Sequence, residues 1–316
     1  MKGLYFGLAF ILLATMIISP LRVLDYSKTP TDTDTPLSQL DYFLVKSSDK
    51  GEIDELSEKE YIIGVLAGEM SPDNLDEALK AQAVAAYSYA LYMREKRLSS
   101  GGEFDLTDSP DTDQKYLSKT ERVALWQDSF DKNEGRLEEI FEAVKGEYLS
   151  FGGKPILALY HSVSSGKTEN CSNVFGGVYP YLCSVESSYD LLSPDYLTVI
   201  SYDSKEFAEK ALNLNITLVG EPTDWIRDPE RSETGNVLSY TLAGHKFKGT
   251  EMRSAFSLPS SNFDLVYENG KFKFTVRGHG HGVGMSQYGA SHMAKLGSGY
   301  ADILALYYPG TIITHK

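Results

Sequence analysis

Residues Ser57–Leu98 read SEKEYIIGVLAGEMSPDNLDEALKAQAVAAYSYALYMREKRL and predict two consecutive helices. Ser57 and Glu60 match the Ser-x-x-Glu capping box, in which each side chain binds the other residue's backbone N–H. The first helix must end near Pro72, because proline lacks an N–H and clashes with the preceding turn. The second helix is expected over Asn74–Leu98, and its alanine-rich middle allows a neighbouring element to pack closely.

An acidic residue interrupts the apolar stripe of the first helix. Ile62, Val65 and Leu66 are spaced i, i+3 and i+4, so position i+7 should also be apolar, but it is Glu69. Burial of a carboxyl group disfavours its charged form and raises its pKa, and the negative end of the helix dipole acts in the same direction. Glu69 is therefore a candidate general acid. The alternative is a frayed last turn that leaves Glu69 in water.

Short strands are predicted on both sides of these helices in the sequence. Tyr42–Val45 and Glu52–Leu56 predict a hairpin across Asp-Lys-Gly. VYENGKFKFTV, Val266–Val276, predicts a second hairpin, because Asn-Gly favours a type I′ turn. Strand-like runs and turns follow Glu147. Further helices are expected over Thr120–Lys132, Leu137–Val144, from about Gln287, and over Tyr300–Tyr308.

These patterns predict an α+β fold in which helices pack on a mixed or antiparallel sheet. One domain is expected over residues 40–316. Residues 190–249 have the weakest periodicity and are predicted to form an inserted smaller lobe.

The N-terminus carries a long apolar run. Residues Gly3 to Leu21 contain no charge, and at about 1.5 Å per residue they span roughly 27 Å, close to the thickness of a bilayer core. Residues 1–24 are therefore predicted to be a membrane anchor, with a cleaved signal peptide as the alternative, and residues 25–39 a polar tether. The rest of the chain is then expected outside the cytoplasm as a single-pass membrane protein.

The charge balance excludes two classes of partner. The formal net charge is −14, so nucleic acid and anionic lipid, which require a basic surface, are not expected. Cys171 and Cys183 are the only cysteines, and their spacing does not distinguish a disulfide from two free thiols.

A glycine-rich stretch, RGHGHGVGMSQYGA, occupies Arg277–Ala290. His279 and His281 are two residues apart, so on a strand they would project from the same face, as zinc ligands can. His161, His292 or Cys171 would have to supply a third ligand. The alternative is the wall of a binding groove, because glycines permit positive φ and close approach of the backbone to a ligand.

Four stretches in order resemble the stage II sporulation protein D family, which shares its domain with the LytB amidase enhancers. They are EYIIGVLAGEM with EALKAQAVAAYSYAL, YHSVSSGKTENCSNVFGGVYPYLCSV, FKGTEMRSAFSLPSSNF and GHGHGVGMSQYGA. The resemblance runs from about Tyr61 to Thr314.

The resemblance implies a membrane-anchored lytic transglycosylase that cuts peptidoglycan between N-acetylmuramic acid and N-acetylglucosamine during engulfment of the forespore. The family's catalytic glutamate matches Glu69. Hydrolytic glycosidases usually need two carboxylates. A lytic transglycosylase uses the sugar's own C6 hydroxyl as the nucleophile, so one glutamate can serve as acid and then base.

The resemblance also suggests substrate contacts. Expected glycan-binding residues are His161, Ser162, Ser164, Lys167, Thr168, His279, His281, Ser286, Gln287 and Tyr288. No cofactor is expected. Some clostridial members bind zinc through Cys and His in the loop after the second helix, but residues 101–116 contain neither. Tyr87 stands where the family commonly has arginine, which puts any role of that arginine in doubt.

The implied partners are peptide-free glycan strands, a membrane protein of the same sporulation stage, and an amidase that removes stem peptides. Two alternatives have different chemistry. The first is a non-catalytic wall-binding module that enhances an N-acetylmuramoyl-L-alanine amidase. The second is a metal-dependent hydrolase centred on the histidines.

Overall fold

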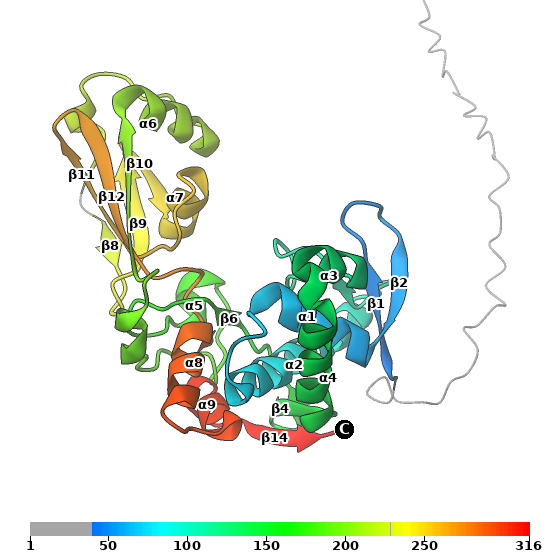
Figure 1. Cartoon of the computed structure of the whole chain (residues 1–316). Coiled ribbons are helices and arrows are strands. Elements are labelled where there is room, and N and C mark those ends of the chain that lie inside the picture. The colour runs from blue at the N-terminus through cyan, green and yellow to red at the C-terminus, as the bar shows by residue number, and fades with distance from the viewer. Residues whose placement is uncertain (1–39, 228) are drawn as a thin grey trace, which may run out of the picture. The chain divides into compact units, whose positions relative to one another are not determined.

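A computed structural model describes residues 40–227 and 229–316 of the chain. The described part has an α+β fold, in which helices and strands follow one another along the sequence (Figure 1). The helices are α1 Glu58–Glu69, α2 Asp76–Ser99, α3 Lys119–Trp126, α4 Phe130–Ala143, α5 Cys171–Val174, α6 Ser204–Ala211, α7 Gly249–Ala255, α8 Gln287–Lys295 and α9 Tyr300–Tyr307.

Within the residues that the structure describes, the strands form five small sheets where a single sheet was predicted. Most pairs are antiparallel, but β1 pairs with β3 and β6 with β13 in parallel. The strands are β1 Tyr42–Lys46, β2 Ile53–Ser57, β3 Leu106–Thr107, β4 Glu147–Phe151, β5 Lys154–Pro155, β6 Tyr160–His161, β7 Leu197–Asp203, β8 Glu230–Arg231, β9 Val237–Leu242, β10 His245–Lys248, β11 Phe263–Glu268, β12 Lys271–Arg277, β13 Met285–Ser286 and β14 Ile312–His315.

The first predicted helix pair is confirmed, with one change at its start. Ser57 caps α1 by accepting a hydrogen bond from the Glu60 amide, as expected. The Glu60 carboxylate does not complete the capping box, because it accepts hydrogen bonds from the guanidinium of Arg122 instead. A buried arginine thus recruits the capping glutamate as one of its counter-ions.

Both predicted hairpins are confirmed. β1 pairs with β2, and β11 pairs with β12 across Asn269 and Gly270. Both turn residues have positive φ, 51° and 76°, as a type I′ turn requires. The predicted break between the third and fourth helices is in the wrong place. It lies at Gln127, whose φ of 46° ends α3, and residues 130–143 form one continuous helix.

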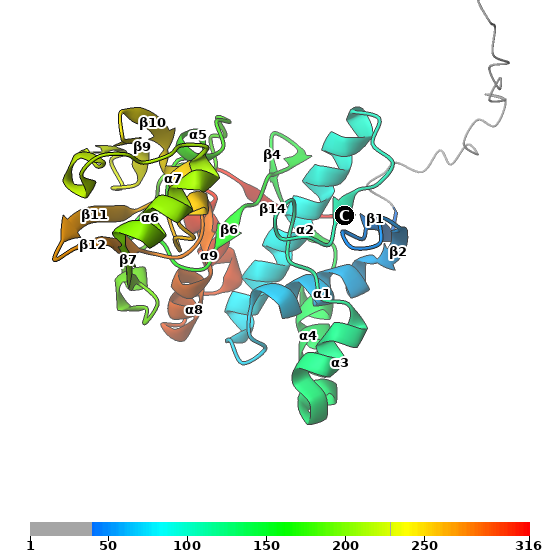
Figure 2. The same ribbon diagram turned by 90° about the horizontal axis from the view of Figure 1, so that it is seen from above.

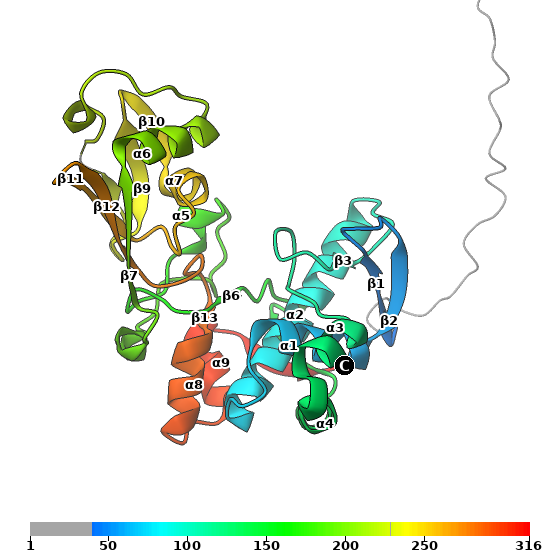
Figure 3. The same cartoon turned by 45° about the horizontal axis from the view of Figure 1, so that its top comes forward.

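The apolar residues form two separate cores. In the first, α2 is the central element, and it packs against α1, α4, α8, α9 and β4 (Figure 2). The second core draws its residues from 207–276, and there α6 contacts β7 and β12 while α7 contacts β9 and β10 (Figure 3). Part of the segment 190–249, where an inserted lobe is predicted, contributes to this second core.

The predicted anchor, 1–24, and tether, 25–39, lie outside the described residues. Within the described residues, none of the helices combines the length and the hydropathy needed to cross a bilayer.

Candidate active site

A cleft of about 590 Å³ brings Glu69 together with residues from distant parts of the chain. Of the predicted site residues, five line it: Glu69, His161, Ser162, His281 and Gln287. Residues 110–115, in the loop after the second helix, form another side, and no site residue was predicted there. Arg253, from α7 of the second core, also lines the cleft.

Glu69 is the last residue of α1 and is half-buried. Its Oε1 accepts a hydrogen bond from the Lys115 amide, with 2.8 Å between oxygen and nitrogen. Burial raises the pKa of the Glu69 carboxyl above its ordinary value, and hydrogen bonds from the Lys115 amide and the Gln287 side chain only partly oppose that shift. The last turn of α1 is therefore a place where a carboxyl group retains its proton to higher pH than in water.

Two glycines let the loop before α3 reach Glu69. Gly64 and Gly68 lie one turn apart on α1, and residues 115–117 pack directly against them. A Cβ atom at Gly68 would lie 2.4 Å from the Lys115 carbonyl oxygen, which is closer than real structures allow. The Leu117 amide also donates to the Gly64 carbonyl, at 3.0 Å. The absence of side chains on this face of α1 thus positions the amide that binds Glu69.

Replacing Gly68 with alanine is expected to push the Lys115 backbone away from Glu69. A displacement of about 1 Å in an active site costs on the order of 10²-fold in rate, so activity should fall by about that factor. The matched control is Gly135→Ala in α4, where an added Cβ meets nothing within 4 Å. That control should leave activity unchanged and stabilise the fold by about 0.5–1 kcal/mol. Equal activities of the two variants, in an assay of the glycan cleavage that the resemblance implies, would contradict this role of Gly68.

Gln114 holds the same loop from inside the protein. Its Nε2 donates to the Tyr61 hydroxyl at 3.1 Å and to the Ala86 carbonyl at 3.3 Å, and its Oε1 accepts from the Tyr160 hydroxyl at 2.8 Å. Gln114 is 4% exposed, so these bonds are protected from water. A buried amide with three internal partners makes the loop a rigid support for Glu69.

His161 and His281 lie beside one another in the cleft, with ring centroids 5.7 Å apart. Burial lowers the pKa of His161 to about 4 and that of His281 to about 3, so both rings are neutral at pH 7. His161 Nδ1 must carry the proton, because its partner is the Val283 carbonyl, 3.2 Å away. Its Nε2 is then an acceptor, and it has no partner among the described residues.

His281 is used differently from His161. Its Nδ1 accepts from the Val283 amide at 3.1 Å, and the Phe175 ring packs on it edge to face. The ring therefore fixes the backbone of the glycine-rich stretch. Of the two predicted histidines in the cleft, His161 retains an unoccupied hydrogen-bonding atom.

The glycines of the stretch 278–284 serve close packing within the chain. Gly280 and Gly284 have φ of 108° and 73°, so the predicted positive φ is present. A Cβ at Gly284 would lie 1.9 Å from the Leu159 carbonyl oxygen, and one at Gly280 would lie 2.8 Å from the His161 Cβ. The close approach at these two positions is made to the chain segment 159–161, whereas the expectation was close approach to a ligand.

Six other predicted binding residues do not line the cleft: Ser164, Lys167, Thr168, His279, Ser286 and Tyr288. Ser164 and Ser286 share one partner, because the buried Asp190 carboxylate accepts from the Ser164 amide and from the Ser286 hydroxyl, each at 2.8 Å. Ser286 also caps α8. Lys167 is exposed and pairs with Glu186 at 2.6 Å.

The remaining three have partners within the chain as well. The Thr168 hydroxyl accepts from the Val185 amide at 2.9 Å. The Tyr288 hydroxyl donates to the Leu192 carbonyl at 3.1 Å, and exposed His279 pairs with Val163 through its backbone. The structure thus gives these residues positions that support the walls of the cleft.

A buried carboxylate joins this wall to the second core. Glu169 is fully buried and accepts hydrogen bonds from Ser232, Thr234, Asn236 and Asn173. Burial opposes its ionisation, but these hydrogen bonds outweigh burial and hold the pKa of Glu169 below its ordinary value.

Sequence comparisons point to the same family as the motifs. The family model described as "Stage II sporulation protein" matches residues 46–151. Stage II sporulation protein D of Bacillus amyloliquefaciens is 34% identical over 286 residues, which cover 90% of this chain and 81% of that protein. The protein of the same name from Bacillus subtilis (strain 168) is 34% identical over 263 residues, covering 83% and 76%.

The chain belongs to the stage II sporulation protein D family. This membership supports a role in sporulation. The chain is also similar to an amidase enhancer of Bacillus subtilis (strain 168). The identity is 27%, and the match covers 79% of this chain and 40% of the amidase enhancer.

Tyr87, at the position where the family commonly has arginine, is not among the cleft residues. It is buried, its ring packs on Phe43, and its hydroxyl donates to Glu58 at 2.7 Å. The tyrosine is therefore part of the junction between α1, α2 and β1.

The other expectations about ligands concern cysteine and metal. Cys171 and Cys183 are both free thiols. In the part of the chain that the structure describes, no three His, Cys, Asp or Glu side chains converge as metal ligands.

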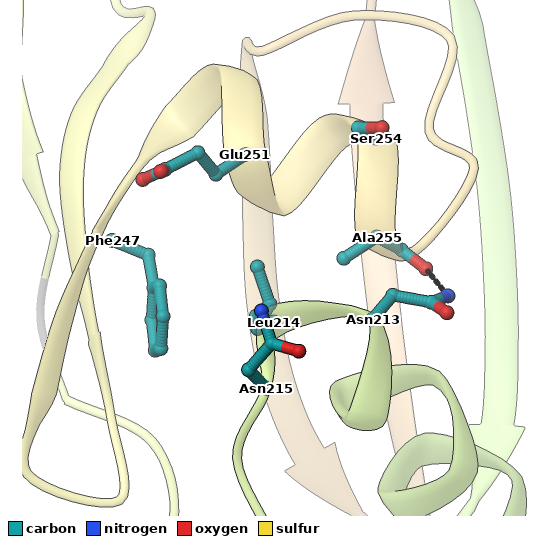
Figure 4. A pocket seen from close by; sticks show the side chains of 7 residues that line it. All are labelled: Asn213, Leu214, Asn215, Phe247, Glu251, Ser254 and Ala255. Carbon is teal, nitrogen blue, oxygen red and sulfur yellow. Dashed lines mark hydrogen bonds between the residues drawn. The ribbon is translucent and has the colours of Figure 1, made fainter. Parts of the chain in front are cut away.

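A second hollow, of about 440 Å³, lies in the other core and shares no residue with the cleft. Phe247, Asn213, Asn215 and Glu251 line it, and the Asn213 amide donates to the Ala255 carbonyl at 3.1 Å (Figure 4). The short helix α7 thus contributes Arg253 to the cleft and Glu251 to this hollow.

Proposed function

We propose that this family member is a lytic transglycosylase that cleaves peptide-free glycan strands of peptidoglycan with Glu69 as its acid and base. The observation that carries the proposal is the half-buried Glu69 carboxyl, with a raised pKa, in a cleft that residues of the predicted motifs line. The cleft's two other acidic residues differ from it. Asp113 is paired with Arg97 at 2.8 Å, and Asp111 is exposed to water.

In the proposed reaction, protonated Glu69 gives its proton to the glycosidic oxygen as the bond from C1 of the muramyl residue to that oxygen breaks. The C6 hydroxyl of the same muramyl residue then attacks C1, and the Glu69 carboxylate takes the hydroxyl proton. One C–O bond is lost, one is formed in the 1,6-anhydro ring, and Glu69 ends protonated. No water is consumed, which agrees with a site that has one suitable carboxyl group.

The neighbours of Glu69 suit both halves of this cycle. The Lys115 amide and the Gln287 side chain stabilise the carboxylate after it has given up its proton. Gln287 is held in turn by Gln82, at 3.4 Å. His161 lines the cleft, and the Val283 carbonyl fixes the orientation of its neutral ring.

The test is product analysis by mass spectrometry after the purified full-length chain has acted on peptide-free glycan strands. Anhydro-muramyl ends are expected. Reducing ends would contradict the transglycosylase reaction and indicate a hydrolase. Strand binding without any cleavage would favour the second candidate, a wall-binding module, which the similarity to an amidase enhancer supports.

The proposal includes the setting of the reaction. We propose that residues 1–24 anchor the chain in the cell membrane and that the catalytic domain, 40–316, acts outside the cytoplasm. An amidase that produces peptide-free strands, and a membrane protein of the same sporulation stage, are the proposed partners.

A further inference from the structure

Arg253 is a cation that lines the cleft. It lies on α7 and is half-buried, and its Nε donates to the Leu258 carbonyl at 3.3 Å. No carboxylate among residues 40–227 and 229–316 forms an ion pair with it. The terminal nitrogens, Nη1 and Nη2, therefore remain for a ligand.

Other shielded arginines of the chain are paired. Arg94 binds Asp105 at 3.1 Å, Arg122 binds two glutamates, and Arg231 and Arg277 share Asp264 at 2.7 Å each. The chain holds 44 acidic residues against 30 basic ones, so carboxylates are in excess. An arginine left without one at the wall of a cleft indicates an anion site that the chain does not fill itself.

The surroundings of Arg253 make its charge effective. Burial lowers its pKa, which reflects poor solvation of the guanidinium. His161 and His281 lie close enough for its charge to lower the pKa of both rings, and both are neutral at pH 7. Arg253 is thus the fixed charge on the histidine side of the cleft, while Glu69 and Lys115 lie together at another part of it.

The proposed substrate carries one kind of ionisable group. In a peptide-free strand, each muramyl residue ends in a free lactyl carboxylate, whereas attachment of a stem peptide converts this group into a neutral amide. A guanidinium binds a carboxylate through two parallel hydrogen bonds, and it has no comparable interaction with an amide.

We infer that Arg253 binds the lactyl carboxylate of a muramyl residue and thereby makes the cleft selective for strands whose stem peptides have been removed. The inference rests on the proposed function, and it adds a specificity-determining residue to it. It also explains why the segment FKGTEMRSAF, which contains Arg253, contributes to a cleft built mainly by the first core.

The test measures binding without turnover, in full-length Glu69→Gln protein. Two probes are compared: peptide-free strands, and the same strands with their lactyl carboxylates converted to methylamides. Adding Arg253→Gln should weaken binding of the free-acid strands by about 10–100-fold, as expected for loss of a hydrogen-bonded charge pair. Binding of the amidated strands should change by less than about 3-fold.

Two further variants make the result specific. Arg227→Gln removes an exposed arginine outside the cleft, and it should leave the affinities for both probes unchanged. Arg253→Lys retains the charge but not the planar fork, so it should lose several-fold in affinity for the free-acid strands only. It also provides the test should Arg253→Gln fail to fold, which thermal unfolding will show.

Equal losses for both probes, or no loss for either, would overturn the inference. Its failure is separable from failure of the proposed function, because the product analysis uses the wild-type chain. Anhydro ends together with a silent Arg253→Gln would reject Arg253 alone. Selective binding without anhydro ends would reject the reaction and support the carboxylate site.

Discussion

Glu69→Gln is expected to reduce the formation of 1,6-anhydro ends by roughly 10²–10⁴-fold, the usual contribution of a general acid and base. Glutamine has nearly the shape of protonated glutamate, and it cannot donate a proton to the leaving oxygen. Initial rates of product release, measured by mass spectrometry, report the effect. Retention of more than about a tenth of wild-type activity would contradict the role of Glu69.

The same variant should not be less stable at pH 7. The pKa of Glu69 is raised in the folded state, so folding favours its protonated form. Between the ordinary glutamate pKa of the unfolded chain and the raised pKa of the folded chain, the unfolded chain loses the Glu69 proton first. The free energy of unfolding therefore declines as pH rises through this range. Glutamine removes this dependence, so its unfolding free energy should equal or exceed that of the wild type. Glu95→Gln, an exposed change on α2, is the matched control and should retain full activity.

Arg122→Ala is expected to lower the free energy of unfolding by about 3–5 kcal/mol, because it leaves the buried Glu134 carboxylate and the half-buried Glu60 carboxylate without their partner. Arg122 is fully buried and binds Glu60 of α1 at 3.0 and 3.1 Å and Glu134 of α4 at 2.9 and 2.8 Å. It also donates to the Leu117 carbonyl at 2.7 Å. One side chain therefore joins α1, α3, α4 and the loop that supports Glu69.

Urea unfolding of the variant, followed by circular dichroism, measures this loss. The control is Lys246→Ala, because Lys246 pairs with Glu230 at 3.0 Å and both side chains are exposed. Exposed ion pairs contribute about 0–1 kcal/mol, so this change should have little effect. Equal destabilisation by the two substitutions would show that the Arg122 cluster is not the structural junction described above.

The features that could be predicted from the sequence depend on local physics. The Asn269–Gly270 hairpin follows from backbone preferences, and the two helices of residues 57–98 follow from periodicity and capping. The spacing of Ile62, Val65 and Leu66 also placed Glu69 on an apolar stripe, and the structure confirms that these three residues are buried.

The features that the sequence did not reveal depend on partners distant in the chain. Glu60 was expected to cap its own helix, but Arg122, 62 residues later, binds it. Ser164 and Ser286 were predicted to bind glycan, and in the structure the Asp190 carboxylate accepts hydrogen bonds from the Ser164 amide and the Ser286 hydroxyl. Gln114 appeared as one polar residue in a loop, because no local pattern marks its three internal partners.

The spacing of Gly64 and Gly68 in the sequence contained information that an analysis of hydrophobic periodicity does not use. Two glycines one turn apart in a helix indicate close approach of another backbone, and here that backbone binds Glu69. Arg253 had no such signal, because its significance depends on which carboxylates the fold places near it.

Titration of the Glu69 carboxyl carbon by ¹³C NMR, in selectively labelled full-length protein, tests the central claim most directly. The account predicts a pKa above that of glutamate in an unstructured peptide, because burial disfavours the charged form of the carboxyl group. A Glu69 pKa equal to or below that of glutamate in an unstructured peptide would contradict a protonated acid in this cleft.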